Sequence, residues 1–275
     1  MGSIVEKVDN NIVRVYKAFN KMEMRVLPGN VAFFFVLALV PIITLVISIV
    51  SKFSISVTTV TELVEQFFPS DASRIIVNTI VGRSSDSGIG IFSLVVLLIA
   101  TNGTYAIINA SNTLYGIKKS DVINDRIKSL ILLIILLLLI IFILVVPFFG
   151  GHILSLIHNN KFYNNILIIY GILRWPVTFF LIYFNLKLIY TIAPSKSISS
   201  SSTTYGALFT TIIWVIVTAI FSYYLKYFAD YSRIYGNLSS IIILMIWIYL
   251  ISYVFVMGIA INSVTMEERS RNIEK

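Results

Sequence analysis

The chain has 275 residues, of which 57% are hydrophobic and 12% are charged, and its formal net charge is +8 at pH 7. Soluble domains average about 25% charged residues, so this composition excludes an ordinary soluble domain. The chain has no cysteine, which excludes disulfides, thiolate nucleophiles and metal sites built on cysteine.

The first 30 residues predict an amphipathic helix. Apolar residues recur at helical spacing over 4–27, and basic residues that include Arg14, Lys17 and Lys21 fall on the opposite side. Such a helix either lies in the membrane surface with its basic side toward anionic headgroups, or packs on the cytoplasmic ends of a helix bundle. Both alternatives place residues 1–30 inside the cell. We expect no cleavable signal peptide, because this segment has no apolar core.

Six later segments are long and apolar enough to cross a membrane, which requires about 20 residues for a hydrocarbon layer of ~30 Å. We predict transmembrane helices at 31–51, 91–114, 129–149, 166–192, 207–228 and 238–262. Residues 52–90, between the first two spans, carry two short helical patterns and predict a small helical cap outside the membrane. The predicted fold is therefore an all-α polytopic membrane protein, with residues 1–275 forming a single membrane domain.

The basic residues predict the orientation of this bundle. Most of the 21 lysines and arginines lie in the amino-terminal segment, in the loop between the second and third spans, and near the carboxyl end. Lysine and arginine accumulate in cytoplasmic loops of membrane proteins, so both termini are predicted to be cytoplasmic. The same rule accounts for the positive net charge, and no nucleic-acid partner is expected.

Arg174 is the most informative charged residue. It lies 13 residues before Lys187, about 20 Å along a helix, so the two cannot both reach the edges of a ~30 Å core. All 13 acidic residues lie outside the predicted spans. Arg174 is therefore expected to use backbone carbonyls, water, Asp230 of the last hairpin, or an anionic ligand such as a lipid phosphate. The alternative is an interfacial arginine that extends to the surface beside Trp175.

Polar side chains line one face of the second span and one face of the fourth. They are costly toward lipid, so we expect them to point into the bundle, either as interhelical hydrogen-bond partners or as the lining of a wet cavity. The two faces could form one polar interior. The candidate ligand-binding residues are Arg174, Asn102, Tyr105, Asn109, Thr178, Asn185 and Asp230.

The sequence contains few residues in positions suited to catalysis or metal binding. With the acidic residues outside the spans, we expect no buried carboxylate to couple proton transport or to bind a metal. The two histidines, His152 and His158, lie in one short outer loop, whereas a zinc site requires three or four ligands. We predict no catalytic residues, no metal and no cofactor.

The last two spans carry an ordered set of positions that resembles the YihY/BrkB family of bacterial inner-membrane proteins. The set extends upstream to Tyr190 with Pro194, to Asn109 with Tyr115, and to residues 30–41. In the last hairpin it comprises Tyr205-Gly206-Ala207, Trp214, Phe221-Ser222, Tyr224, Tyr231, Tyr235-Gly236, Trp247-Ile248-Tyr249, Gly258 and Asn262.

This resemblance implies a six-span bundle in the bacterial cell membrane, with a role in the cell envelope or in transport. The older ribonuclease BN-like label of the family does not fit these residues, because nuclease chemistry requires a cluster of metal-binding side chains. Family members often carry a glutamate two residues before the final asparagine. This chain has Ala260 there, so a coupling role for that acid is not expected.

The leading hypothesis is a non-enzymatic membrane protein that binds or moves an anionic amphiphile, either a lipid or an envelope precursor, with membrane lipids as its partners. A second hypothesis is a non-transporting scaffold, whose cap and basic amino-terminal helix recruit envelope proteins. The third is a ribonuclease, which requires metal-dependent RNA cleavage.

Overall fold

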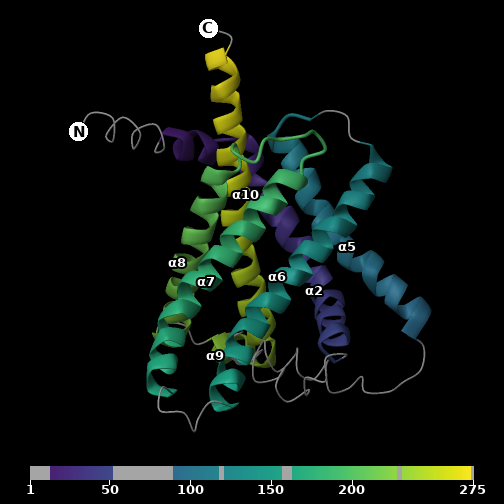
Figure 1. Ribbon diagram of the computed structural model, residues 1–275. Helices are drawn as coiled ribbons and strands as arrows, with labels where there is room; N and C mark the ends of the chain where they lie inside the picture. Colours follow the sequence, from purple (N-terminus) through teal and green to yellow (C-terminus); the bar gives the residue numbers. More distant parts are fainter. Residues whose placement is uncertain (1–12, 52–88, 118–120, 157–162, 228–230, 274–275) are drawn as a thin grey trace.

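The computed structural model describes residues 13–51, 89–117, 121–156, 163–227 and 231–273 (Figure 1). Within these ranges the chain is helical and contains no strand, which confirms the all-α prediction. The long helices are α2 (Leu27–Ser51), α5 (Ile89–Leu114), α6 (Val122–Leu156), α7 (Tyr163–Ile192), α8 (Thr204–Tyr227) and α10 (Ser239–Ile273). Short elements are α9 (Tyr231–Tyr235) and the 3-10 turns η1 (Met22–Arg25) and η2 (Gly236–Leu238).

Three helices in the described part of the chain are long and apolar enough to cross a membrane: Gly171–Ile192, Thr204–Tyr227 and Ile241–Glu268. A helix satisfies its backbone hydrogen bonds internally, so it can present apolar side chains to lipid along its whole length. On α8, for example, Ile212, Val215 and Ile220 are exposed. The count of six spans remains a prediction from the sequence.

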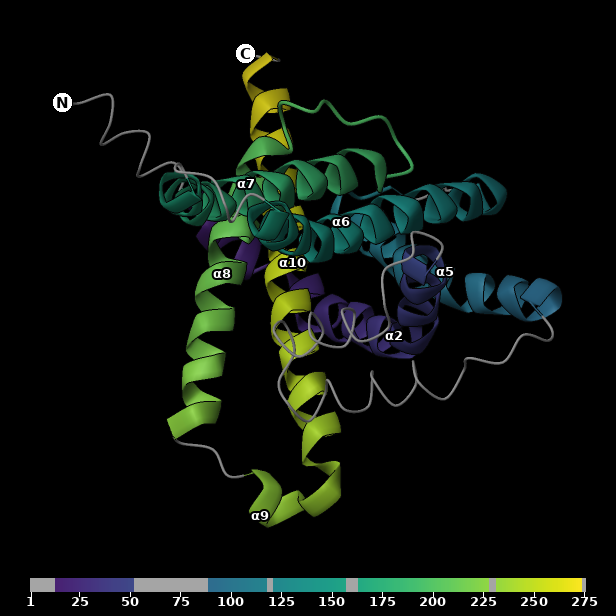
Figure 2. The ribbon, with the colours of Figure 1, turned by 60° about the horizontal axis from the view of Figure 1, so that its bottom comes forward.

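The six long helices form a closed ring in chain order. α2 packs against α5, α5 against α6, α6 against α7, α7 against α8, and α8 against α10, which returns to α2. Figure 2 shows α8 and α10 side by side, with α9 near their shared end. Successive long helices alternate in direction, so α2 begins at the end of the bundle where α10 finishes (Figure 1). We call this end the termini end.

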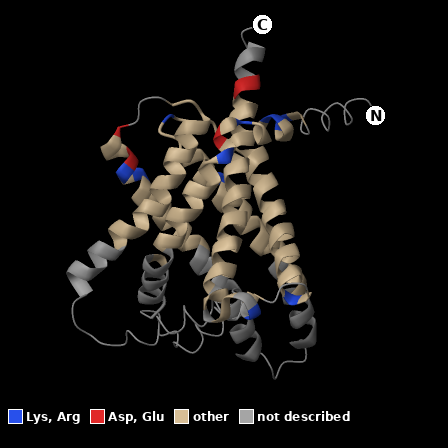
Figure 3. Cartoon of the chain, turned by 180° about the vertical axis from the view of Figure 1, so that it is seen from behind, with Lys and Arg blue, Asp and Glu red and all other residues tan. Residues whose placement is uncertain are grey.

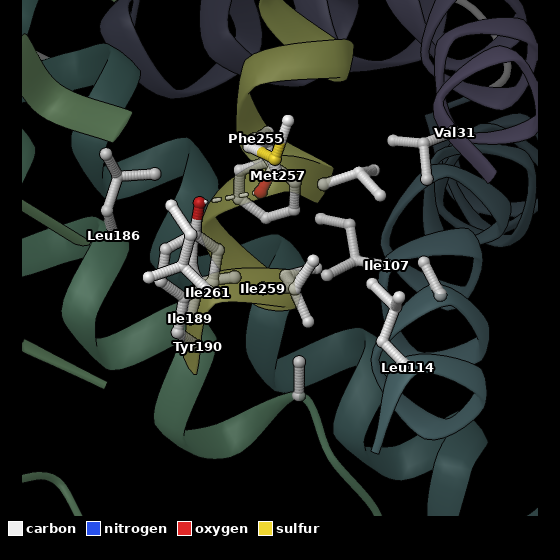
Figure 4. Close-up of a cluster of buried hydrophobic side chains, with 14 of the residues drawn as sticks. Val31, Ile107, Leu114, Leu186, Ile189, Tyr190, Phe255, Met257, Ile259 and Ile261 are labelled. Carbon is white, nitrogen blue, oxygen red and sulfur yellow. Dashed lines mark hydrogen bonds between the residues drawn. The ribbon is translucent and has the colours of Figure 1, made fainter. Parts of the chain in front are cut away.

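The hydrophobic core lies near the termini end, around the second half of α10. Val256 and Ile259 of α10 are buried against Ile107 of α5 and against Leu186 and Tyr190 of α7. Figure 4 shows side chains of α5, α7 and α10 meeting in this core, with Val31 of α2 at one side. The core is therefore shared by helices from both ends of the chain.

Two glycines allow α8 and α10 to approach closely. A Cβ atom at Gly206 would overlap the carbonyl oxygen of Gly258, and one at Gly258 would overlap the Thr210 hydroxyl. The Gly206 amide donates a hydrogen bond to Asn262 Oδ1 at 2.8 Å, and the Tyr190 hydroxyl donates to the Phe255 carbonyl at 2.9 Å. Small residues at a crossing and hydrogen bonds across it are typical of membrane helix packing. Four of the residues behind the family resemblance thus meet where α7 and α8 contact α10: Tyr190, Gly206, Gly258 and Asn262.

Several predicted boundaries differ from the structure where a helix continues into polar sequence. α6 begins at Val122 instead of residue 129, and α10 ends at Ile273 instead of residue 262. α7 is continuous through Pro176. The predicted cap at 52–90 lies almost entirely outside the described residues, as does Asp230.

In the described part of the chain, the amino-terminal segment packs on the helix bundle, which is the second of the two predicted alternatives. Residues 13–19 are helical, and the helix is interrupted before η1. Arg14 pairs with Glu268 at 2.8 Å, and Lys21 pairs with Glu267 at 3.0 Å, so the basic side faces α10. Phe19 and Met22, on the predicted apolar side, are exposed. The described part of the segment therefore packs on the bundle, with Val15 against the core and with Phe19 and Met22 exposed.

Candidate functional site

Four polar residues on one face of α5 fall into two groups: Asn102 and Tyr105, which contact Arg126 of α6, and Asn109 and Asn112. The Arg126 Nη1 atom donates a hydrogen bond to Asn102 Oδ1 at 3.0 Å. The guanidinium carbon lies 4.4 Å from the centroid of the Tyr105 ring. A cation above an aromatic face is attracted by the ring quadrupole. Two of the predicted residues thus hold one arginine, which the sequence had assigned to a cytoplasmic loop.

The second group lies one to three turns farther along α5. Asn112 is buried and forms two hydrogen bonds with Ser195, while Asn109 is exposed. The exposure of Asn109 differs from the expectation that the whole line points inward. The four positions spread over about 80° of the helix circumference, and neighbouring helices cover only one edge of that arc.

A buried carboxylate joins the second group. Ser195 Oγ donates a hydrogen bond to Asp125 Oδ1 at 2.5 Å and accepts one from Asn112 Nδ2 at 2.7 Å. Asp125 is fully buried, and its Oδ2 atom has no partner among the described residues. Lys128 donates to the carbonyl of Pro194 at 2.8 Å, which ties the same loop to α6. These contacts fix the segment after α7 onto the start of α6.

The expectation that no carboxylate is buried in the bundle is therefore wrong. The low hydropathy of the sequence before residue 129 predicts a loop at Asp125, yet α6 includes this residue. The signal was present in the spacing: Ser129, Leu132 and Leu133 are buried, and one step of four residues back reaches Asp125. Proton-coupled transport is therefore no longer disfavoured by the lack of a buried carboxylate.

The predicted residues of α7 contact α6 on a different part of that helix. Asn185 is buried and donates from Nδ2 to the Ile135 carbonyl at 3.0 Å, while its Oδ1 atom has no described partner. Thr178 is half-buried. The backbone of Arg174 lies in α7, and its side chain is outside the described part of the structure. Asn102 and Tyr105 of α5 contact Arg126 of α6, whereas Asn185 of α7 contacts Ile135 of the same helix.

Charged residues gather at the termini end, as Figure 3 shows for the described part of the chain. Lys21 makes three polar contacts there. Its Nζ atom donates to Ser263 Oγ at 2.8 Å, to Glu267 Oε1 at 3.0 Å and to the Leu114 carbonyl at 3.4 Å. Lys17 pairs with Glu268 at 3.1 Å. Beside this cluster the Tyr115 hydroxyl is buried, and burial raises its pKa well above the usual range. This cluster joins the first helix to the last.

Over the described ranges, no three histidine, aspartate or glutamate side chains come together in a group that could hold a metal ion. The polar sites that the structure does describe are built from amides, hydroxyls, arginine, lysine and the carboxylates of Asp125, Glu267 and Glu268. Such groups can bind a charged headgroup, an ion or water by hydrogen bonding.

Residues 15–275 match the family model described as Virulence factor BrkB. A protein of Bacillus subtilis (strain 168), named as the ribonuclease-like protein YfkH, is 30% identical over 240 residues, covering 86% of this chain and 87% of that protein. A UPF0761 membrane protein of Haemophilus influenzae (strain 86-028NP) is 25% identical over 269 residues, covering 94% of this chain and 96% of its own length. No solved structure matches the chain.

Proposed function

Because this chain belongs to the Virulence factor BrkB family, we propose that it is an integral protein of the bacterial cell membrane that binds and translocates an anionic amphiphile. The amphiphile is a lipid or an envelope precursor, and both chain termini face the cytoplasm. The role is non-enzymatic. The ribonuclease-like name belongs to the Bacillus subtilis relative and is not transferred to this chain.

The observation that carries the proposal is a closed helix ring in which two buried polar atoms have no partner within the described ranges. Asp125 Oδ2 on α6 and Asn185 Oδ1 on α7 are both buried without a described partner. Each such atom costs about 1–3 kcal/mol relative to a paired one. A headgroup, an ion or water that passes between the helices would supply the missing partners.

Arg174 has a suitable position to act on the same route. It lies 11 residues before Asn185 on α7, about three helical turns away and on the same face. Its charge would attract an anionic headgroup, while the apolar chains of the amphiphile stay in contact with the exposed apolar surface of the helices. Charged residues within membrane helices usually mark substrate pathways.

The test is translocation of fluorescent phosphatidylglycerol by the purified protein in reconstituted vesicles. Arg174→Leu is expected to abolish flux, and Arg174→Lys to retain part of it. Lys226→Leu serves as the control, because Lys226 is exposed near the far end of α8. Unchanged flux in Arg174→Leu would overturn the proposal.

The other hypotheses predict different results. A scaffold would tolerate Arg174→Leu but lose its function when residues 1–25 or 56–82 are deleted. A ribonuclease would cleave RNA in a metal-dependent way after contaminating nucleases have been removed. Neither result is expected of a lipid carrier.

A further inference from the structure

We propose that Arg126 is a binding site for the phosphate of an anionic phospholipid, on the outer surface of the bundle between α5 and α6. The site goes beyond the proposed function, because a lipid bound there need not be the one that is translocated. Its ligand is a phospholipid of the surrounding bilayer with a net negative headgroup.

The guanidinium of Arg126 is held in place before any ligand arrives. Asn102 accepts one of its N–H groups at 3.0 Å, and the Tyr105 ring lies against it at 4.4 Å. Both contacts come from α5, so a second helix sets the orientation of a side chain on α6. An arginine has five N–H donors in a planar fork that matches a phosphate group. One hydrogen bond to Asn102 leaves the other donors for a ligand.

No acidic side chain in the described part of the chain forms an ion pair with Arg126. The nearby acids in the sequence have other partners. Asp125 accepts from Ser195, and Asp121 accepts from Asn124 and from the Ile123 amide at the start of α6. Arg126 is exposed, so its charge is open to an external anion.

The surface around Arg126 is apolar and exposed, as a phospholipid requires. Ile123 and Leu130 lie three residues before and four residues after Arg126, on the same side of α6, and their exposed fractions are 73% and 38%. Farther from the termini end, Ile134 of α6 and Leu98 of α5 are also exposed. A phosphate at Arg126 would therefore have apolar helix surface beside it for the acyl chains.

A free inorganic phosphate would be recognised by the same donors but would gain nothing from this apolar surface. An acidic peptide would have to compete with lipid for a surface that is mostly apolar. The combination of one oriented cation with exposed isoleucine and leucine favours the lipid. Charge-assisted hydrogen bonds of arginine to phosphate are stronger than neutral ones.

Binding can be measured by native mass spectrometry and by lipid titration of the full chain in detergent, with phosphatidylglycerol, phosphatidylcholine and inorganic phosphate as the three probes. The chain is expected to prefer phosphatidylglycerol. Arg126→Gln should weaken that binding by about tenfold or more. Tyr105→Leu should weaken it less, and Tyr105→Phe should preserve it, because the ring and not the hydroxyl contacts the guanidinium.

Lys196→Gln provides the matched control, because Lys196 is an exposed cation in the loop after α7 and carries the same charge. Equal loss of binding in Lys196→Gln and Arg126→Gln would overturn the proposal, since it would reflect net charge alone. Complete displacement by inorganic phosphate, without any preference for phosphatidylglycerol over phosphatidylcholine, would also overturn it. Arg174→Leu should bind normally at this site, so failure here is distinguishable from failure of translocation.

Discussion

Ser195 Oγ donates a 2.5 Å hydrogen bond to Asp125 Oδ1, and this contact joins the segment after α7 to the first turn of α6. The same hydroxyl accepts from Asn112 of α5. Three parts of the ring therefore meet at one serine. Because Asp125 is fully buried, its carboxylate depends on this hydroxyl for pairing.

Removing that hydroxyl should destabilise the protein. Ser195→Ala leaves both carboxylate oxygens of Asp125 without a described partner, and an unsatisfied buried polar group costs about 1–3 kcal/mol. The melting temperature in detergent should fall measurably. Ser199→Ala is the control, because Ser199 lies in the same segment and its hydroxyl pairs with the hydroxyl of exposed Ser201. Equal melting temperatures for the two variants would contradict the structural role of Ser195.

The crossing of α8 and α10 should not tolerate a side chain at Gly258. An added Cβ would overlap the hydroxyls of Thr210 and Tyr190, and overpacking of this kind costs about 1–3 kcal/mol or more. Gly258→Ala is expected to lower the melting temperature and the yield of folded protein. In Gly171→Ala the new Cβ meets open space, so that variant should behave like the parent chain.

The ion pairs of Glu268 should control how firmly the amino-terminal segment is attached. Glu268 contacts both Arg14 and Lys17, and the two carboxylate bonds measure 2.8 Å and 3.1 Å. These groups are partly exposed, so Glu268→Gln should cost about 1 kcal/mol or less. Trypsin should then cleave after Arg14 and Lys17 several times faster.

High salt should accelerate cleavage of the parent chain in the same way, because salt screens exposed charges. Glu23→Gln is a suitable control, since Glu23 lies in the same segment but outside these pairs. If cleavage were independent of salt and unchanged in Glu268→Gln, the ion pairs would not hold the segment.

Replacing Asn185 should distinguish an effect on stability from an effect on lipid flux. The Nδ2 atom of Asn185 donates to the Ile135 carbonyl, whereas its buried Oδ1 atom has no partner among the residues that the structure describes. Asn185→Leu loses the Nδ2 hydrogen bond, but it also removes the buried Oδ1 atom, and the Ile135 carbonyl still accepts a helical hydrogen bond within α6, so the two effects on stability oppose each other. Asn185→Leu should therefore keep the melting temperature within a few degrees and still reduce lipid flux severalfold. Normal flux would remove Asn185 from the proposed route.

Much of the fold followed from hydropathy. The carboxyl ends of α5 at Leu114 and α7 at Ile192 are where the sequence predicts them. Hydropathy locates the part of a helix that contacts lipid, but helical hydrogen bonding continues into polar sequence. For this reason the start of α6 and the last turns of α10 were missed, and Asp125 with them.

The contacts within the candidate site could be predicted from the sequence less well than the helices. Asn102 and Tyr105 were selected as polar residues on a membrane helix, which a helical period can reveal. Their partner, Arg126, could not be predicted, because it comes from the next helix and depends on how α5 and α6 cross. Asn109 belongs to the same line and is exposed, since neighbouring helices cover only part of that face.

By itself, the sequence determined that this is a helical membrane protein of one family, because apolar length and an ordered motif are local properties of the chain. Only the tertiary structure decided which polar residues meet. It paired Asp125 with Ser195, placed Arg126 on Tyr105, and closed the ring between α2 and α10. The physical reason is that burial and pairing depend on which helix faces come into contact.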